Sequence, residues 1–264
     1  MAEAEAFADL SILVEAARAG GAVALALQGQ AAQWDKDDGT PVSDGDLAAD
    51  DAIASILSAK RPQYGILTEE RGGAADQPAP VIIVDPLVGT RAYLAGKPDW
   101  SVVLARVERG RPTAGVVFQP RTGAMFTAVA GLGAYVGEEP LRLAPVPAAG
   151  AVIAAPGPLH TSDGGLRDQG FARAPYIGSL ALRLMRVADG SFGGVITKAG
   201  PPHRDLAAAD IIVQEAGGLL TSLNGAEPRY NTAVTRHRPV IAGASASVVD
   251  RLRAFAQSHY AAAA

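Results

Sequence analysis

Residues 81–90 read VIIVDPLVGT and are the most informative stretch of the chain. The apolar run at residues 81–84 predicts a buried strand that ends at Asp85, because short runs of branched apolar residues favour strands. Gly89 and Thr90 follow at once, and their backbone N–H groups would open a helix in a way that suits a phosphate. The sequence therefore predicts an acidic side chain next to an anion-binding turn.

Two further acidic positions occupy comparable places along the chain. Glu69 and Glu70 follow a predicted strand at residues 65–67, and Asp205 begins a predicted helix that ends before Gly217. Open α/β sheets place ligands where strand ends face helix starts, and clustered carboxylates bind hard cations such as Mg²⁺. These positions indicate metal-assisted phosphate chemistry. The alternative is that each acidic side chain is a solvated cap at a loop end.

Helical patterns dominate the beginning of the chain. Apolar residues at helical spacing predict a helix over residues 5–28, with a weak point at Gly20 and Gly21. After a polar loop, Ser43 and Asp46 resemble a capping box that opens a second helix. The N-terminal region is thus expected to contribute two helices.

Short strands and helices alternate through the remainder of the chain. Residues 101–107 and 113–118 flank a turn and predict an antiparallel hairpin. The other predicted elements are strands at residues 125–129, 151–155, 194–197 and 240–242 and helices at residues 179–189 and 247–256. The alternation predicts an α/β fold, a layered sandwich with an N-terminal half (1–145) and a C-terminal half (146–264) in one compact unit. The site would lie between the halves, because only the second half carries Asp205.

Composition and charge narrow the classes of function. The chain has 264 residues, a net charge of −4 and scattered Lys and Arg residues, so a nucleic-acid-binding surface is not expected. It has no cysteine, which excludes disulfides, thiolate metal sites and a cysteine nucleophile. No apolar run is expected to span a membrane, and the acidic first dozen residues are unlike a signal peptide. We expect a cytoplasmic protein.

Seven motifs follow one another in the order of a known family. Residues 84–90 (V-D-P-L-V-G-T) and 205–218 (D-x-A-A-x-x-I-I-x-x-E-A-G-G) match its two signatures. The others are K-x-D-G-T-P-V-S-x-x-D (36–46), T-E-E (68–70), G-V-V-F-Q-P (115–120), G-x-G-A-Y (131–135) and G-S-L-A-L-R-L-M-R-V-A-D-G (178–190). The chain thus resembles the inositol monophosphatase superfamily, the magnesium-dependent phosphatases of small molecules. Residues 89–101 look closer to its bisphosphate-nucleotidase and histidinol-phosphatase branches.

The resemblance implies an αβαβα sandwich and assigns roles to individual residues. Glu69 would bind a first ion and, together with Thr90, orient the attacking water. Asp85 would bridge two ions and join the catalytic residues. The metal ligands that the resemblance implies are Glu69, Asp85, Asp205, the carbonyl of Leu87 and, for a water or a weak third ion, Asp46. The implied reaction is in-line attack of a metal-activated water on a phosphomonoester, with two or three Mg²⁺ ions.

Val88 departs from the family pattern. It stands where the signature has its second aspartate, and valine has no oxygen to offer a metal. The second ion would keep only Asp85 and Asp205 as carboxylate ligands, so we expect that site to be weakened, by at least ~10–100-fold in affinity or activity. Three explanations are open. They are a pseudo-enzyme, an inactivating substitution, and compensation by another acid, for which the candidates are Asp44, Asp46 and Asp99.

Other departures concern the substrate. Lys198 stands where inositol phosphatases place a glutamate that binds sugar hydroxyls, which indicates a more anionic or otherwise different leaving group. Arg204 stands where many relatives have tryptophan, and it could face the phosphate or solvent. Arg183 has a weaker implication of the same kind, and a solvated helix face explains it more simply. A structural or exposed role is favoured for His203. The substrate-binding residues implied are Gly89, Thr90, Lys198 and Arg204.

The leading hypothesis is a Mg²⁺-dependent phosphatase of a small phosphorylated metabolite. Inositol monophosphate, adenosine 3′,5′-bisphosphate and histidinol phosphate are the candidate substrates. The alternative is a catalytically impaired member that binds a phosphate ligand, or an inactivated variant, and Val88 is the argument for it. The resemblance implies a homodimer. Neither a nucleic-acid polymer nor a membrane is an expected partner.

Overall fold

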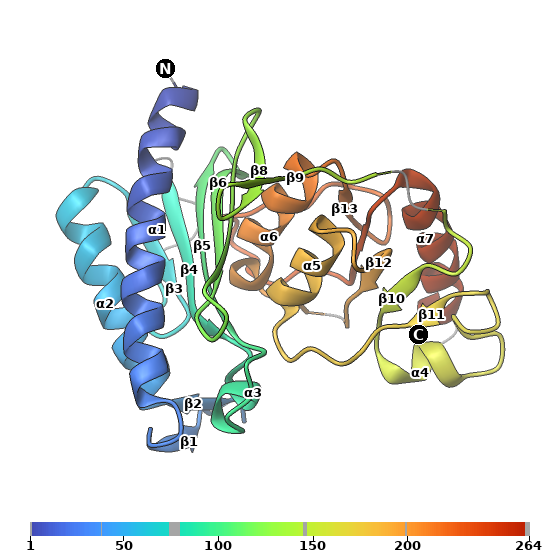
Figure 1. The fold of residues 1–264 in the computed structure, drawn as a ribbon, viewed down its shortest axis with the longest axis horizontal. Coiled ribbons are helices and arrows are strands. Elements are labelled where there is room, and N and C mark those ends of the chain that lie inside the picture. The colour runs from blue at the N-terminus through green and yellow to red at the C-terminus, as the bar shows by residue number, and fades with distance from the viewer. Residues whose placement is uncertain (1, 38, 74–79, 145–146, 199, 262–264) are drawn as a thin grey trace.

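The structure is a computed structural model that describes residues 2–37, 39–73, 80–144, 147–198 and 200–261. Its helices and strands form five successive layers, seen from left to right in Figure 1. Two N-terminal helices come first, followed by a large sheet, two more helices, a smaller sheet and a last helical layer. The αβαβα sandwich is confirmed.

The first layer consists of α1 (Ala2–Leu27) and α2 (Asp44–Lys60). α1 runs without a break through Gly20 and Gly21, so the predicted weak point is wrong. The two helices approach so closely that a side-chain carbon on Gly20 would lie 2.7 Å from Ile53 Cδ1. Gly20 therefore serves helix packing and does not end a helix.

α1 bears on the expectation about membrane-spanning segments. The helical stretch Glu5–Leu27 is long and apolar enough to cross a membrane by length and composition alone, with a mean hydropathy of 1.6. In the fold, α1 lies against α2 and the large sheet, and Leu13, Ala16 and Ala17 are fully buried there. Small apolar residues give the helix this hydropathy and also let it pack closely as part of the core.

The large sheet has seven described strands in the order β3-β4-β5-β6-β7-β8-β9. β3 and β4 are parallel, and each later pair is antiparallel. The predicted hairpin is confirmed as β5 and β6. The strands are β3 (Gly65–Thr68), β4 (Val81–Val88), β5 (Ser101–Glu108), β6 (Arg111–Gln119), β7 (Ala124–Val129), β8 (Gly133–Val136) and β9 (Glu139–Leu141).

The middle helices α5 (Leu180–Ala188) and α6 (His203–Glu215) pack between the two sheets. The smaller sheet has the described order β11-β10-β12-β14-β13, and α7 (Ala246–Ala261) covers its outer face with α4 (Gly157–Thr161) nearby (Figure 1). Its strands are β10 (Val152–Ala154), β11 (Ala172–Arg173), β12 (Gly194–Ile196), β13 (Leu219–Ser222) and β14 (Val240–Gly243). The predicted long helices of this half are confirmed to within a few residues.

Short elements account for most differences from the sequence prediction. β1 (Gln33–Asp35) and β2 (Pro41–Ser43) pair within the stretch predicted as a polar loop. β8, β9, β11, β13 and α4 were also not predicted, because elements of two to five residues are too short to show a period. The predicted boundary between the two halves falls at residues 145–146, which lie outside the described residues. The division into halves stays a prediction.

β4 runs three residues beyond its predicted end at Asp85 and carries the chain into the site. Its pairing with β5 shifts register between Asp85 and Val88, which is a local bulge. Gly89 then adopts a φ of 101°, and a side-chain carbon there would lie 3.0 Å from the Asp99 carbonyl oxygen. Glycine is therefore required at this turn, from which α3 (Thr90–Leu94) starts.

Candidate active site

The three acidic positions singled out in the sequence come together at one end of the large sheet. Glu69 follows β3, Asp85 lies in β4, and Asp205 lies in the first turn of α6. They line one pocket of about 460 Å³, which we term the carboxylate pocket. Other predicted site residues line the same pocket, namely Leu87, Gly89, Thr90 and Arg204.

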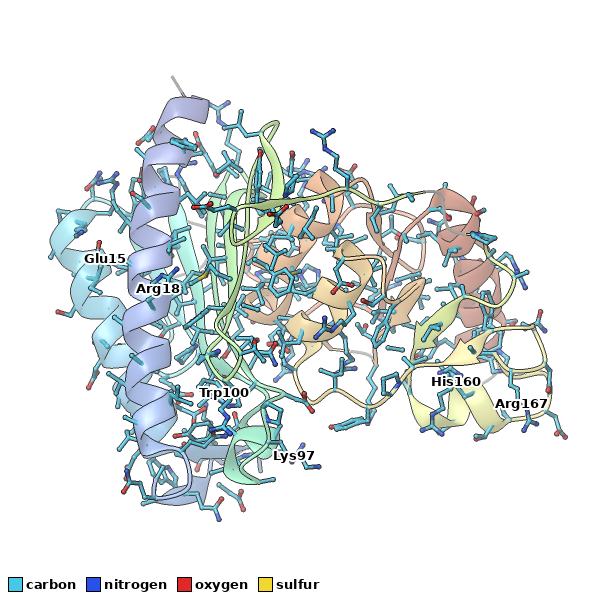
Figure 2. The ribbon with its side chains drawn as sticks, viewed as in Figure 1. Glu15, Arg18, Lys97, Trp100, His160 and Arg167 are labelled. Atoms are coloured by element: carbon cyan, nitrogen blue, oxygen red, sulfur yellow. The ribbon has the colours of Figure 1, made fainter. Side chains whose placement is uncertain are left out.

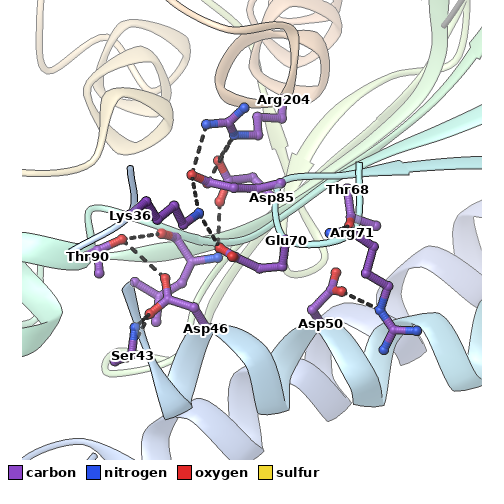
Figure 3. A network of polar contacts seen from close by, with 12 residues as sticks. Lys36, Ser43, Asp46, Asp50, Thr68, Glu70, Arg71, Asp85, Thr90 and Arg204 are labelled. Atoms are coloured by element: carbon purple, nitrogen blue, oxygen red, sulfur yellow. Dashed lines mark hydrogen bonds and ion pairs between the residues drawn. The ribbon is translucent and has the colours of Figure 1, made fainter. Parts of the chain in front are cut away.

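Arg204 directs its guanidinium group at two of these carboxylates (Figure 3). Its Nη2 atom lies 2.9 Å from Glu69 Oε1, and its Nε donates to Glu69 Oε2 at 3.0 Å. Nε also lies 3.3 Å from Asp85 Oδ2. The two bonds to Glu69 are the two-point contact that arginine makes with carboxylates. Arg204 therefore contacts predicted metal ligands, an arrangement that the sequence did not suggest.

Lys36 is a second cation beside these carboxylates, and sequence reasoning missed it. Its Nζ lies 3.1 Å from Glu69 and 2.8 Å from Glu70 (Figure 3). The available signal was its position at the start of the K-x-D-G-T motif. Glu69 thus shares its negative charge between two cationic side chains, Lys36 and Arg204.

Burial and mutual repulsion raise the pKa values of two carboxylates of the pocket, Asp85 and Asp205. Burial, followed by the negative charges of Glu69 and Asp205, raises the pKa of Asp85 well above its usual range. Burial also raises the pKa of Asp205 to about 6, against the lowering effect of Arg204. Carboxylates that face one another out of water favour the binding of a cation. Arg204 offsets only part of this effect, because the pKa values of both aspartates stay raised beside it.

Asp46 lies behind the carboxylate pocket rather than in its lining. It is 2% exposed, and its Oδ2 accepts from the backbone N–H of Ser43 at 2.9 Å and from Ser43 Oγ at 2.6 Å. The predicted capping arrangement at the start of α2 is confirmed. Thr90 Oγ1 donates to Asp46 Oδ1 at 3.2 Å and lies 3.3 Å from the Leu87 carbonyl oxygen. Asp46 therefore fixes the position of Thr90.

Val88 ends β4 with its side chain in the core between the two sheets, where it is 5% exposed. It borders the carboxylate pocket and offers no oxygen there. Of the acids considered as replacements, Asp99 lines the pocket. Asp44 instead accepts from the N–H of Ala32 at 3.2 Å, and Asp46 is engaged as described above. Asp99 is the candidate that the fold places at the pocket.

The oxygen atoms of the pocket suit a hard divalent cation in their chemistry. Mg²⁺ takes carboxylate and carbonyl oxygens, and the lining supplies them through Glu69, Asp85, Asp205 and Leu87. Within the described ranges, however, no three His, Cys, Asp or Glu side chains are arranged to hold a metal ion as they stand. The residues fit the ion, provided that Arg204 releases the carboxylates it now contacts.

A second pocket of about 460 Å³ adjoins the first, and we term it the basic pocket. Lys198, a predicted substrate-binding residue, lines the basic pocket and not the carboxylate pocket. Arg183 lines it as well and is half-buried, so its interpretation as part of a solvated helix face is wrong. The residues that line both pockets are Arg91, Tyr176, Gly178 and Asp205.

His203 and Trp100 are packing residues. His203 is buried against His237, with ring centroids 4.6 Å apart, and burial lowers its pKa to about 4. The structural role favoured for His203 is confirmed. Trp100 is fully buried edge-on to Tyr93, with centroids 5.1 Å apart, whereas Lys97 points outward at the rim of the carboxylate pocket (Figure 2).

A five-layer sandwich that gathers strand-end and helix-start carboxylates around one pocket places the chain in a class of small-molecule phosphatases. The chain belongs to the inositol monophosphatase family, whose family model matches residues 8–260.

Three curated relatives carry different descriptions. A histidinol-phosphatase of Mycobacterium tuberculosis is 36% identical over 219 residues, which cover 75% of this chain and 81% of that protein. An inositol-1-monophosphatase of Mesorhizobium japonicum is 33% identical, with coverages of 73% and 76%. The Nus factor SuhB of Pasteurella multocida is 34% identical, with coverages of 68% and 71%.

Solved structures share the whole fold. The extragenic suppressor protein suhB of Bartonella henselae has a TM-score of 0.81 at 29% identity and covers 94% of this chain and 98% of its own. The inositol monophosphatase of Thermotoga maritima has a TM-score of 0.80 at 26% identity, with coverages of 95% and 98%. The names histidinol-phosphatase and inositol-1-monophosphatase indicate phosphatase activity, and they differ in the molecule acted on.

Proposed function

We propose that this chain is a Mg²⁺-dependent phosphomonoesterase of a small phosphorylated metabolite. The observation that supports this most directly is the gathering of Glu69, Asp85, Asp205 and Thr90 around one pocket. Carboxylates at that density favour a hard cation, and a cation there favours a phosphate. The family membership and the names of the relatives support the same reaction.

Each residue has a distinct proposed role. Glu69, Asp85 and the Leu87 carbonyl would hold a first ion, and Asp85 with Asp205 would hold a second, more weakly for want of an oxygen at position 88. When bound, these ions would supply a more acidic water and neutralise charge on the phosphate. A third, weak position near Asp46 stays a prediction.

The chain's own side chains would position the reacting water and the phosphate. The hydrogen bond to Asp46 holds the Thr90 hydroxyl in place, and Thr90 with Glu69 would orient the water. The water oxygen would bond to phosphorus, the bond from phosphorus to the alcohol oxygen would break, and the alcohol would leave with a proton. Gly89 would contribute its backbone to phosphate binding, and Arg204 would reach the phosphate only after it leaves Glu69.

The relatives suggest which probes to use. Histidinol phosphate and inositol monophosphate follow from their names, and adenosine 3′,5′-bisphosphate follows from the sequence motifs. The homodimer and the cytoplasmic location stay predictions.

The test is phosphate release from these three compounds over a series of Mg²⁺ concentrations. The wild-type chain, Val88→Asp and Asp85→Asn are compared, with Val88→Ala as the control for disturbing the core. We expect Val88→Asp to lower the Mg²⁺ requirement or raise the rate by ~10–100-fold, and Asp85→Asn to lower phosphate release by at least ~100-fold. If neither the wild type nor Val88→Asp releases phosphate from any of the three compounds, the proposed function is wrong for this substrate range.

A second candidate is a phosphate-ligand-binding protein with little or no turnover. Two features of the carboxylate pocket favour it. Val88 takes the place of a metal ligand, and Arg204 contacts two further proposed ligands, Glu69 and Asp85. Calorimetric binding of the same compounds without phosphate release would support this candidate. Release by the wild-type chain that depends on Mg²⁺ would exclude it.

A further inference from the structure

The basic pocket is a second binding site next to the proposed reaction site. It has the same volume as the carboxylate pocket, about 460 Å³, and the two share Arg91, Tyr176, Gly178 and Asp205 in their linings. A small molecule can therefore extend from one pocket into the other. Whatever group is joined to the phosphate in the carboxylate pocket would enter the basic pocket.

Positive charge dominates the lining of the basic pocket. Four cationic side chains face one carboxylate, that of Asp205, which also lines the carboxylate pocket. The four cations are Arg91, Arg173, Arg183 and Lys198. In the described part of the chain, none of the four has a carboxylate within ion-pair distance. Their charge is available to a ligand.

Arg183 is the best-positioned of these cations. It lies on α5, which is held between the two sheets, and its Nε donates to the Ser179 carbonyl at 3.4 Å. The guanidinium is half-buried, and this burial lowers its pKa against the attraction of Asp205, which lines the same pocket beyond ion-pair distance. Arg186, three residues further along α5, is instead paired with Asp189 at 2.9 Å and does not line the pocket.

A desolvated cation without a counter-ion is unfavourable for the free protein and favourable for an anionic ligand. We propose that the basic pocket binds a second anionic group on the substrate, so that the preferred substrate is a phosphomonoester whose alcohol carries another phosphate or a carboxylate. This inference rests on the proposed function for the position of the reacting phosphate. It assigns Arg183 and Lys198 as the residues that determine specificity.

Two matched pairs of compounds test the inference and separate the two kinds of anion. Adenosine 3′,5′-bisphosphate is compared with adenosine 3′-monophosphate, and 3-phosphoglycerate with glycerol 3-phosphate. The wild-type chain is expected to have a kcat/KM at least ~10-fold higher for the more anionic member of one pair or both, as hydrogen bonds to charged groups predict. The pair that shows the preference identifies phosphate or carboxylate as the second group.

The variant Arg183→Gln keeps the length and polarity of the side chain and removes its charge. We expect it to lower kcat/KM for the preferred compound by ~10-fold or more and to change the rate for the matched compound by less than about 3-fold. Arg186→Gln, on the same helix outside the pocket, is the control and should change neither. Equal kcat/KM values within both pairs, or equal losses for both members on Arg183→Gln, would overturn the inference.

Calorimetry on the same proteins distinguishes failure of this inference from failure of the proposed function. If no compound is turned over, the proposed reaction fails. A binding preference for the more anionic member that Arg183→Gln removes and Arg186→Gln retains would still support the anion site. Equal binding of both members of each pair would refute the anion site whether or not turnover occurs.

Discussion

The carboxylate pocket and the basic pocket have the same volume and share part of their lining. They differ in whether their charged side chains form ion pairs within the protein. In the first, Glu69 and Asp85 already contact Arg204. In the second, Arg183 has no carboxylate partner among the described residues. A cation that enters the first pocket must displace an ion pair, whereas an anion that enters the second meets an unpaired charge. The comparison teaches that the pairing of charges, more than their number, determines what a pocket binds.

The largest effect is expected from Asp85→Asn, which removes the carboxylate that the proposed mechanism uses most. Phosphate release should fall by at least ~100-fold, while binding in the basic pocket should persist because that pocket does not include Asp85. Phosphate release and calorimetric binding of adenosine 3′,5′-bisphosphate measure the two effects. Asp250→Asn, on the surface of α7, is the control. Full activity of Asp85→Asn would remove the carboxylate pocket from the mechanism.

Asp210 tests what burial does to a carboxylate that has neutral partners. It lies on α6 with Asp205, and burial raises its pKa to about 6, while Gln214 and Tyr230 donate hydrogen bonds to it. Between the ordinary aspartate pKa of 3.8 and about 6, the folded protein keeps a proton that the unfolded chain has lost. The free energy of unfolding should therefore fall as the pH rises through this range, by about 3 kcal/mol at most.

Asp210→Asn should remove this part of the pH dependence. Urea unfolding between pH 4 and pH 6 measures the slope, with Asp189→Asn as a control at a partly exposed carboxylate. The same slope in Asp210→Asn and the wild type would mean that burial alone does not raise carboxylate pKa values in this layer.

Removal of Arg204 should destabilise the protein when no divalent cation is present. Arg204→Ala leaves Glu69 and Asp85 without their shared cation, which should cost about 1–3 kcal/mol and lower the melting temperature by roughly 2–10 °C. Mg²⁺ should restore more stability to this variant than it adds to the wild type. Arg236→Ala is the matched control, since Arg236 lines the same pocket but donates to the Gly200 carbonyl. Equal melting temperatures of the two variants in EDTA would contradict the pairing.

The smallest effect is expected from Arg183→Gln on stability. Because Arg183 has no ion pair to lose, the free energy of unfolding should stay within about 0.5 kcal/mol of the wild type or rise. The measurement is urea unfolding beside Arg204→Ala under metal-free conditions. A loss as large as that of Arg204→Ala would show that Arg183 is paired in solution, and the contrast between the two pockets would disappear.

The sequence predicted the fold and the membership of the site better than the contacts within it. Ordered motifs identified Glu69, Asp85 and Asp205, and the fold gathers them at one pocket. The direction of Arg204 could not be predicted, because a long flexible side chain takes its position from carboxylates that are distant in the chain. Lys36 was missed for the same reason. Periodicity also could not show that β4 continues through a bulge to Val88.

Glycines were the other limit of the sequence prediction. The low helix propensity of glycine makes Gly20 look like a helix breaker. In the fold, its lack of a side chain lets Ile53 of another helix approach closely. Gly89 was placed correctly at a turn, whereas its tight contact with the Asp99 carbonyl depends on the folded chain. Such contacts are properties of pairs of segments, and a single sequence shows one segment at a time.

Val88 has a consequence at the level of the gene. Valine codons that end in T or C differ from aspartate codons only in their middle base, whereas those that end in A or G differ in two bases. With a codon of the first kind, a cell that depends on this protein for phosphate release can reach the aspartate by one spontaneous mutation. Growth selection followed by sequencing of codon 88 would show whether Val88→Asp is an advantage in a protein whose Arg204 lines the same pocket.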